Sequence, residues 1–101
     1  MADDQRETKR IPFEDDVRIL SPQRIPGKAA DIGAGGIGVI LPVGLAVGAS
    51  VEMEIFSGHA ITYGTVRWSR TSEEGFRIGI QFRVEDWSVI ELVLALRGQE
   101  G

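Results

Sequence analysis

The chain has 101 residues, of which 43% are hydrophobic and 26% are charged, and its formal net charge is -4. This length gives room for a single domain with one core, and the acidic balance disfavours DNA, RNA or an anionic membrane surface as a partner. No apolar run approaches the roughly 18 residues of a membrane span, no secretory signal opens the chain and no cysteine is present, so we expect a cytoplasmic domain without membrane insertion, disulfides or a thiolate site.

The N-terminal residues 1–16 mix acidic and basic side chains closely and carry few large apolar ones, which is typical of a flexible arm. This arm contains Arg6 and Arg10, spaced as R-x-x-x-R. Two guanidinium groups can grip a phosphate or stack on a purine, although in an arbitrary charged tail they are more often simply solvated. From Val17 the pattern changes, and we place a single folded domain at residues 17–101.

Three short apolar segments come next, separated by turns rich in proline and glycine, and they predict strands at residues 17–21, 28–32 and 37–41. Between the second and third lies the segment Asp31-Ile-Gly-Ala-Gly-Gly36. A carboxylate can accept hydrogen bonds from a guanine edge, and glycine lets a ligand approach the backbone closely. Asp31 also has a structural alternative as an Asx-turn, and Gly36 has one as a turn residue with positive φ.

The same segment satisfies the dinucleotide fingerprint G-x-G-x-x-G between Gly33 and Gly38. That fingerprint requires a helix that opens on the turn, whereas the apolar run ending at Pro42 predicts a strand, so we interpret the match as accidental. The single histidine, His59, lies at a predicted hairpin tip without an orienting partner. We therefore expect a binding module rather than an enzyme, with no metal site and no resident cofactor.

Three further segments predict strands at residues 50–56, 59–68 and 76–82. In the first of them Val51, Met53 and Ile55 alternate with polar residues, which is typical of a strand with one wet side. Gly64 is a candidate bulge where the inward set changes phase, after which Trp68 points into the core together with Phe76 and Phe82. Six short strands predict a small antiparallel barrel, so the fold class is mainly β.

From about Glu85 the apolar pattern becomes helical, with Asp86 as cap or Ser88 and Glu91 as a capping box, and with Gly98 beyond the last turn. Apolar residues surround this helix instead of forming one stripe. One side should pack on the barrel. The rest predicts either a homodimer formed through the helix or a barrel mouth that encloses much of it.

In their order along the chain, the arm motif and the glycine turn resemble the signatures R-x-x-x-R and [D/N]-x-S-x-x-G of the PilZ domain, a bacterial receptor module for cyclic di-GMP. The resemblance continues through Gly64-Thr-Val-Arg-Trp68 and Gly79-Ile-Gln-Phe82, which match the G-x-V-x-W and G-[I/V]-x-F segments of that family. It implies a six-stranded barrel with a C-terminal helix and a mobile arm that folds over bound nucleotide. The residues that would bind cyclic di-GMP are Arg6, Arg10, Asp31, Gly33 and Gly36.

Gly33 stands where the family usually carries serine, and Gln5 stands where many members have an additional arginine. Losing one hydrogen bond to a charged group costs about 1.5 to 3 kcal/mol, or one to two decades in affinity. Two functions therefore remain open. The resemblance implies either a cyclic di-GMP receptor that acts on a protein partner in motility, secretion or biofilm control, or a degenerate domain that binds no nucleotide and serves as a protein-protein interaction module.

Overall fold

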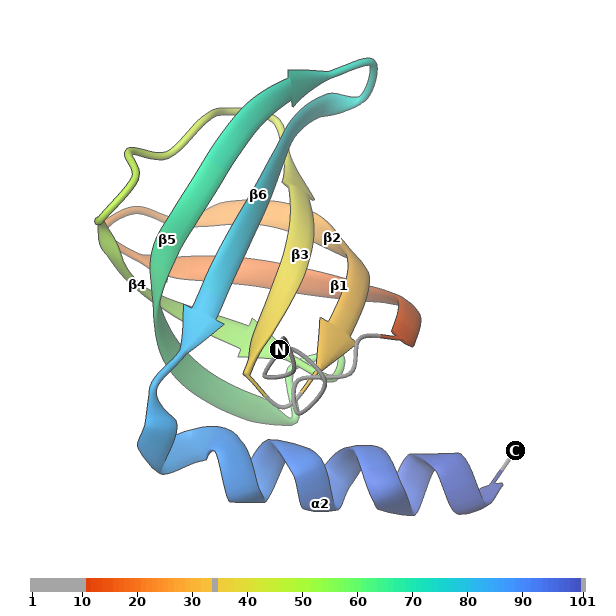
Figure 1. Ribbon diagram of the computed structural model, residues 1–101. Coiled ribbons are helices and arrows are strands. Elements are labelled where there is room, and N and C mark those ends of the chain that lie inside the picture. The colour runs from red at the N-terminus through yellow and green to blue at the C-terminus, as the bar shows by residue number, and fades with distance from the viewer. Residues whose placement is uncertain (1–10, 34, 101) are drawn as a thin grey trace, which may run out of the picture.

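The computed structural model describes residues 11–33 and 35–100, and the structural statements below concern this part of the chain. Six antiparallel strands close into one barrel, and a single helix follows them (Figure 1). The order around the barrel is β1-β2-β3-β6-β5-β4, with β4 pairing back onto β1. The elements are β1 (Ile11–Ser21), β2 (Ile25–Gly33), β3 (Gly36–Leu41), β4 (Ser50–Ile55), β5 (Ala60–Ser72), β6 (Gly75–Phe82) and α2 (Val84–Glu100). The predicted mainly β barrel with a C-terminal helix is confirmed.

The first strand begins at Ile11, not at Val17 as the sequence predicted, so residues 11–16 belong to the barrel. Phe13 is buried there, and its ring meets the ring of Phe56 edge to face at 5.7 Å. Burial alternates regularly through Phe13, Asp15 and Val17, but the half-buried residue between the two apolar ones is acidic, so the sequence shows no apolar alternation before Val17. The rest of the predicted arm, residues 1–10, lies outside the described part of the chain.

Aliphatic side chains fill the interior of the barrel. The predicted alternation in β4 is confirmed, because Val51, Met53 and Ile55 are all buried. An antiparallel barrel of this size has an interior just wide enough for side chains. The most deeply buried apolar residues are Phe82, Ile19, Ile32, Ile37, Leu41, Met53, Ile55, Ile78, Val39 and Val66. Among the described residues Thr62 is the polar one that is buried.

The predicted inward position of Trp68 is wrong, because the bulge of β5 lies three residues beyond Gly64. Gly64 pairs regularly with Val51 and with Phe82, whereas the register with β6 shifts between Val66 and Trp68. The extra residue at that shift turns Trp68 to the outer face, where 37% of its surface is exposed. Of the other two aromatic residues, Phe82 is buried as predicted and Phe76 is partly buried against the core.

The helix α2 runs across the end of the barrel at which β6 finishes (Figure 1). Ile90 is buried, whereas Val84 and Leu92 are 67% and 60% exposed. The helix continues through Gly98 to Glu100 and does not stop at the glycine as predicted. A glycine inside a helix costs only about 1 kcal/mol relative to alanine, so it does not by itself end one. No helix in residues 11–33 and 35–100 is long and apolar enough to cross a membrane.

Candidate functional site

The hairpin between β2 and β3 carries the predicted glycine turn. Gly33 and Gly36 pair directly across this hairpin, and the Phe82 amide donates a hydrogen bond of 2.9 Å to the Gly35 carbonyl. Gly36 lies in β3 without a positive φ, so a left-handed turn is not the reason for glycine at this position. The turn is thus held against β6 through backbone groups, and its glycines present no side chains to a ligand.

A row of paired residues crosses the outer face of four strands next to this turn. Asp31 in β2 pairs with Gly38 in β3, Gly38 pairs with Gly79 in β6, and Gly79 pairs with Trp68 in β5. Residues directly opposite in antiparallel strands point to the same face of a sheet. A Cβ atom added at Gly38 would lie 3.0 Å from Oδ1 of Asp31, and one added at Gly79 would overlap the indole of Trp68. The carboxylate and the indole therefore lie over the two glycines.

We call these two glycines, Gly38 and Gly79, the glycine floor. The side chains of Asp31 and Trp68 cover this strip of backbone, with the acceptor at one end and the aromatic ring at the other. Glycine at both positions lets the carboxylate and the indole lie close to the sheet. The sequence pattern did not predict Trp68 as a surface residue. The signal that could have found it is glycine at position 79, because an outward indole on β5 needs a small residue opposite it on β6.

The point where the N-terminal arm joins the barrel lies beside Asp31. Ile11 pairs with Ile32 and Pro12 pairs with Asp31, so the chain enters β1 next to the predicted acceptor. Arg10 immediately precedes Ile11 in the sequence. Arg6 and Arg10 themselves lie outside the described residues, so the structure brings together Asp31, Gly33 and Gly36 of the predicted site.

A small cavity of about 220 Å³ lies beside the glycine turn, between β5, β6 and the start of the helix. Gly36, Trp68 and Trp87 are among the residues that line it. Trp87 is held by a hydrogen bond of 3.0 Å from its indole N–H to the Phe82 carbonyl. Indole rings can stack on nucleobases. The cavity thus adds a second aromatic side chain, from α2, to the surroundings of the turn.

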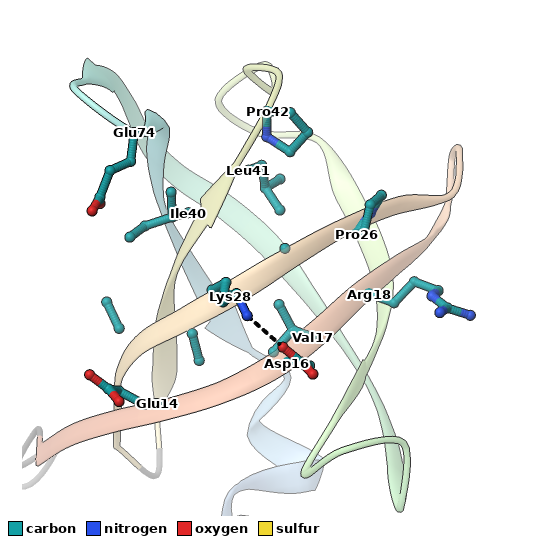
Figure 2. Close-up of a pocket in the computed structure, with 13 residues that line it drawn as sticks. Glu14, Asp16, Val17, Arg18, Pro26, Lys28, Ile40, Leu41, Pro42 and Glu74 are labelled. Atoms are coloured by element: carbon teal, nitrogen blue, oxygen red, sulfur yellow. Dashed lines mark hydrogen bonds and ion pairs between the residues drawn. The ribbon is translucent and has the colours of Figure 1, made fainter.

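A larger groove of about 1100 Å³ lies on the outer face of β1, β2 and β3, beside the row that contains Asp31 (Figure 2). It reaches Ala30, the neighbour of Asp31, and Ile40 contributes to its lining. Figure 2 shows Lys28 directed towards Asp16, to which its ammonium group donates a hydrogen bond of 3.0 Å. The groove therefore has its own ion pair and adjoins the glycine floor without including Asp31.

A polar cluster anchors the first turn of α2 to the barrel. The Thr62 hydroxyl donates to Oδ2 of Asp86 at 3.0 Å, and Arg83 donates to both carboxylate oxygens at 3.4 Å. Burial raises the pKa of Asp86, but the hydrogen bonds from Arg83 and Thr62 outweigh it and leave this pKa below its ordinary value. The hydrogen bond to Asp86 in turn raises the pKa of Arg83. Because Arg83 also lies over the Tyr63 ring at 4.4 Å, we interpret the cluster as a clamp on the helix.

The described part of the chain offers little support for a histidine-based site, a metal site or a dinucleotide-binding turn. His59 lies at the turn between β4 and β5, where its Nδ1 is 2.8 Å from the Phe56 carbonyl of the same turn. Among residues 11–33 and 35–100 no group of three or more His, Cys, Asp or Glu side chains is arranged to hold a metal ion. The dinucleotide fingerprint is indeed accidental, because β3 and not a helix follows the glycine turn.

Comparisons with known proteins agree with the family resemblance and with the fold. The family model described as "PilZ domain" matches residues 4–95. A search of curated proteins finds no match. Among solved structures, the Bacillus subtilis inhibitor of motility MotI/DgrA is similar in fold, with a TM-score of 0.68 and 20% sequence identity over 93% of this chain and 51% of that one. This chain thus spans about half the length of that protein. Because the family model covers almost the whole chain, the chain belongs to the PilZ domain family.

Proposed function

We propose that this PilZ domain is a cytoplasmic receptor for cyclic di-GMP that passes the level of this second messenger to a protein partner. PilZ domains are receptor and adaptor modules, and the match to the family extends over residues 4–95. The observation that carries the proposal for this chain is the pairing of Pro12 with Asp31. It brings the entry point of the R-x-x-x-R arm next to the carboxylate that would read a guanine.

Each predicted residue has a physical role in this proposal. Arg6 and Arg10 bind phosphate and stack on a purine through their planar guanidinium groups. Asp31 accepts hydrogen bonds from the two N–H groups on the Watson-Crick edge of guanine, which adenine does not offer in the same pattern. Gly33 and Gly36 keep side-chain bulk away from the ligand. Trp68, which lies over Gly79, adds an aromatic surface at the far end of the glycine floor.

Motility is the process that we favour among those open to such a receptor. The structural neighbour MotI/DgrA is named as an inhibitor of motility. At 20% identity this likeness concerns the fold, so the partner in motility, secretion or biofilm control is part of the proposal.

Calorimetric titration of cyclic di-GMP into the whole chain tests the receptor function. We expect saturable binding by the wild type, its loss in Arg10→Ala, and an affinity within about twofold of the wild type in the control Arg24→Ala, because Arg24 lies in the turn between β1 and β2. Gly33→Ser should strengthen binding by about one decade if the serine hydroxyl restores one hydrogen bond. Absence of binding in the wild type and in Gly33→Ser would contradict the proposal.

A second candidate function is a protein-protein interaction module that binds no nucleotide. Two observations favour it: glycine replaces the family's serine at position 33, and α2 exposes Val84 and Leu92. In this case the helix would contact a partner protein or a second copy of the chain. Leu92→Glu should then abolish association in analytical ultracentrifugation or partner pull-down, while Arg10→Ala leaves it unchanged. The receptor function predicts the opposite sensitivity for nucleotide binding.

A further inference from the structure

Two arginines face each other on the outer surface of the β5–β6 hairpin. Arg70 and Arg77 are directly paired across these antiparallel strands. Like charges at directly opposite positions destabilise a sheet, and a negative charge close to both guanidinium groups would offset their repulsion. Within residues 11–33 and 35–100 the ion pairs join Lys28 to Asp16 and Arg83 to Asp86, and neither Arg70 nor Arg77 lies within 4.0 Å of a carboxylate oxygen of this part.

The two arginines lie next to the glycine floor. The pairing continues from Arg77 to Ile40 in β3, from Ile40 to Lys28 in β2, and from Lys28 to Asp16 in β1. This second row runs beside the row from Trp68 to Asp31, two residues further along each of β5, β6 and β3, which is a separation of about 7 Å. Both rows lie on the outer face, because the carboxylate of Asp31 covers Gly38 and the ion pair of Lys28 with Asp16 is exposed.

Lys28 is not equivalent to the two arginines, although it belongs to the same row. Its ammonium group is directed towards Asp16, as Figure 2 shows, and the apolar side chain of Ile40 stands between it and Arg77. Arg70, in contrast, stacks on Trp68, with its Cζ atom 4.6 Å from the ring centroid. That contact holds a guanidinium group at the edge of the glycine floor.

We propose that Arg70 and Arg77 form a phosphate-binding subsite, which holds one phosphodiester of the cyclic dinucleotide at the end of the glycine floor away from Asp31. This proposal rests on the proposed receptor function. A phosphate between two guanidinium groups accepts charge-assisted hydrogen bonds from both and removes their mutual repulsion. From Asp31 in β2 to Trp68 in β5 the row spans three strand spacings, or about 14 Å, which fits a dinucleotide better than a mononucleotide. Asp31 and this subsite would thus contact opposite ends of the ligand.

The first test compares cyclic di-GMP affinity among single and double variants by calorimetry. Arg70→Gln and Arg77→Gln keep side-chain length and remove the charge, and Arg24→Gln makes the same change in the β1–β2 turn. We expect each of the first two to lower the affinity roughly 10-fold, the double variant up to about 100-fold, and the control less than about twofold. Unchanged affinity in the double variant, with binding in the wild type intact, would overturn the subsite while leaving the receptor function in place.

The second test uses inorganic pyrophosphate and does not depend on cyclic di-GMP. Pyrophosphate is titrated into the whole chain while the side-chain Nε–Hε signals of its arginines are followed by NMR. We expect saturable shifts for Arg70 and Arg77, no comparable shift for Arg24, and loss of the response in the double variant. Saturable shifts with pyrophosphate, in a protein that does not bind cyclic di-GMP, would support the phosphate subsite. They would overturn the receptor function and the assignment of a cyclic dinucleotide as the ligand. Shifts equal to those of Arg24 would overturn the subsite.

Discussion

Asp31 and Trp68 lie at the two ends of one cross-strand row, with only Gly38 and Gly79 between them. The carboxylate lies over the first glycine and the indole over the second. An acceptor and an aromatic ring are thereby held close to the sheet on the outer face of a barrel whose interior is filled by apolar side chains.

Gly79→Ala should displace Trp68. The added methyl group would occupy the space of the indole, so we expect the free energy of unfolding to fall by about 1 to 3 kcal/mol and the tryptophan fluorescence to change. Urea unfolding measures the first effect. In a Trp68→Ala background the same glycine substitution should cost little, because the clashing ring is gone. An equal cost in both backgrounds would show that the ring does not need the glycine.

Asp31→Asn should weaken binding of cyclic di-GMP about 10- to 100-fold, because one charged acceptor of the guanine edge is replaced by an amide that also donates. The wild type should prefer cyclic di-GMP to cyclic di-AMP, and the variant should lose most of that preference. Calorimetry with both ligands gives the two ratios. Asp16→Asn is the matched control, since it changes an exposed carboxylate of β1 that pairs with Lys28. A similar loss in the control would argue against a specific role for Asp31.

Arg77→Gln should stabilise the free protein by about 0.2 to 1 kcal/mol, because it removes a like-charge pair with Arg70. The gain should be largest at low salt and shrink towards 1 M salt, where the Debye length falls to about 3 Å. Urea unfolding at two salt concentrations tests this, with Arg24→Gln as the reference for a charge change elsewhere. A loss of stability at low salt would mean that Arg77 has a stabilising partner.

Asp86→Asn should destabilise the protein at neutral pH, by about 1 kcal/mol, because it weakens the clamp with Thr62 and Arg83. Burial raises the pKa of Asp86, but the hydrogen bonds to the charged carboxylate dominate and lower it from 3.8. The folded state therefore holds the proton less tightly than the unfolded state. The contribution of the carboxylate is fully present above pH 3.8 and is lost as the pH falls through the lowered pKa.

Unfolding of the wild type and Asp86→Asn, followed by urea titration at several values between pH 7 and pH 2.5, measures this contribution. The difference in the free energy of unfolding between the two proteins should be constant at the higher pH values and should disappear below about pH 4. Glu91→Gln is the control, since Glu91 is an exposed carboxylate on the same helix. If the difference for Asp86→Asn stayed constant to pH 2.5, its charge would not contribute to the clamp.

Local patterns allowed much of the fold to be predicted. The alternation of Val51, Met53 and Ile55 is a property of one strand, and the structure places all three side chains in the core. The start of β1 could not be found in this way, because the half-buried Asp15 lies between Phe13 and Val17 and interrupts the apolar alternation. The position of the bulge before Trp68 could not be predicted from the sequence either. Its position depends on which residue of β6 lies opposite, and periodicity along β5 does not contain that information.

The sequence by itself determined the class of the fold, the family and the residue types proposed to bind a nucleotide, because hydrophobic period, turn residues and motif spacing are all local along the chain. Only the tertiary structure decided that Pro12 faces Asp31, that Trp68 lies over Gly79 on the outer surface, and that Arg70 faces Arg77. The physical reason is strand register. Closing the barrel fixes which residues of distant segments lie opposite one another, and a shift of one residue would turn each of these side chains to the other face.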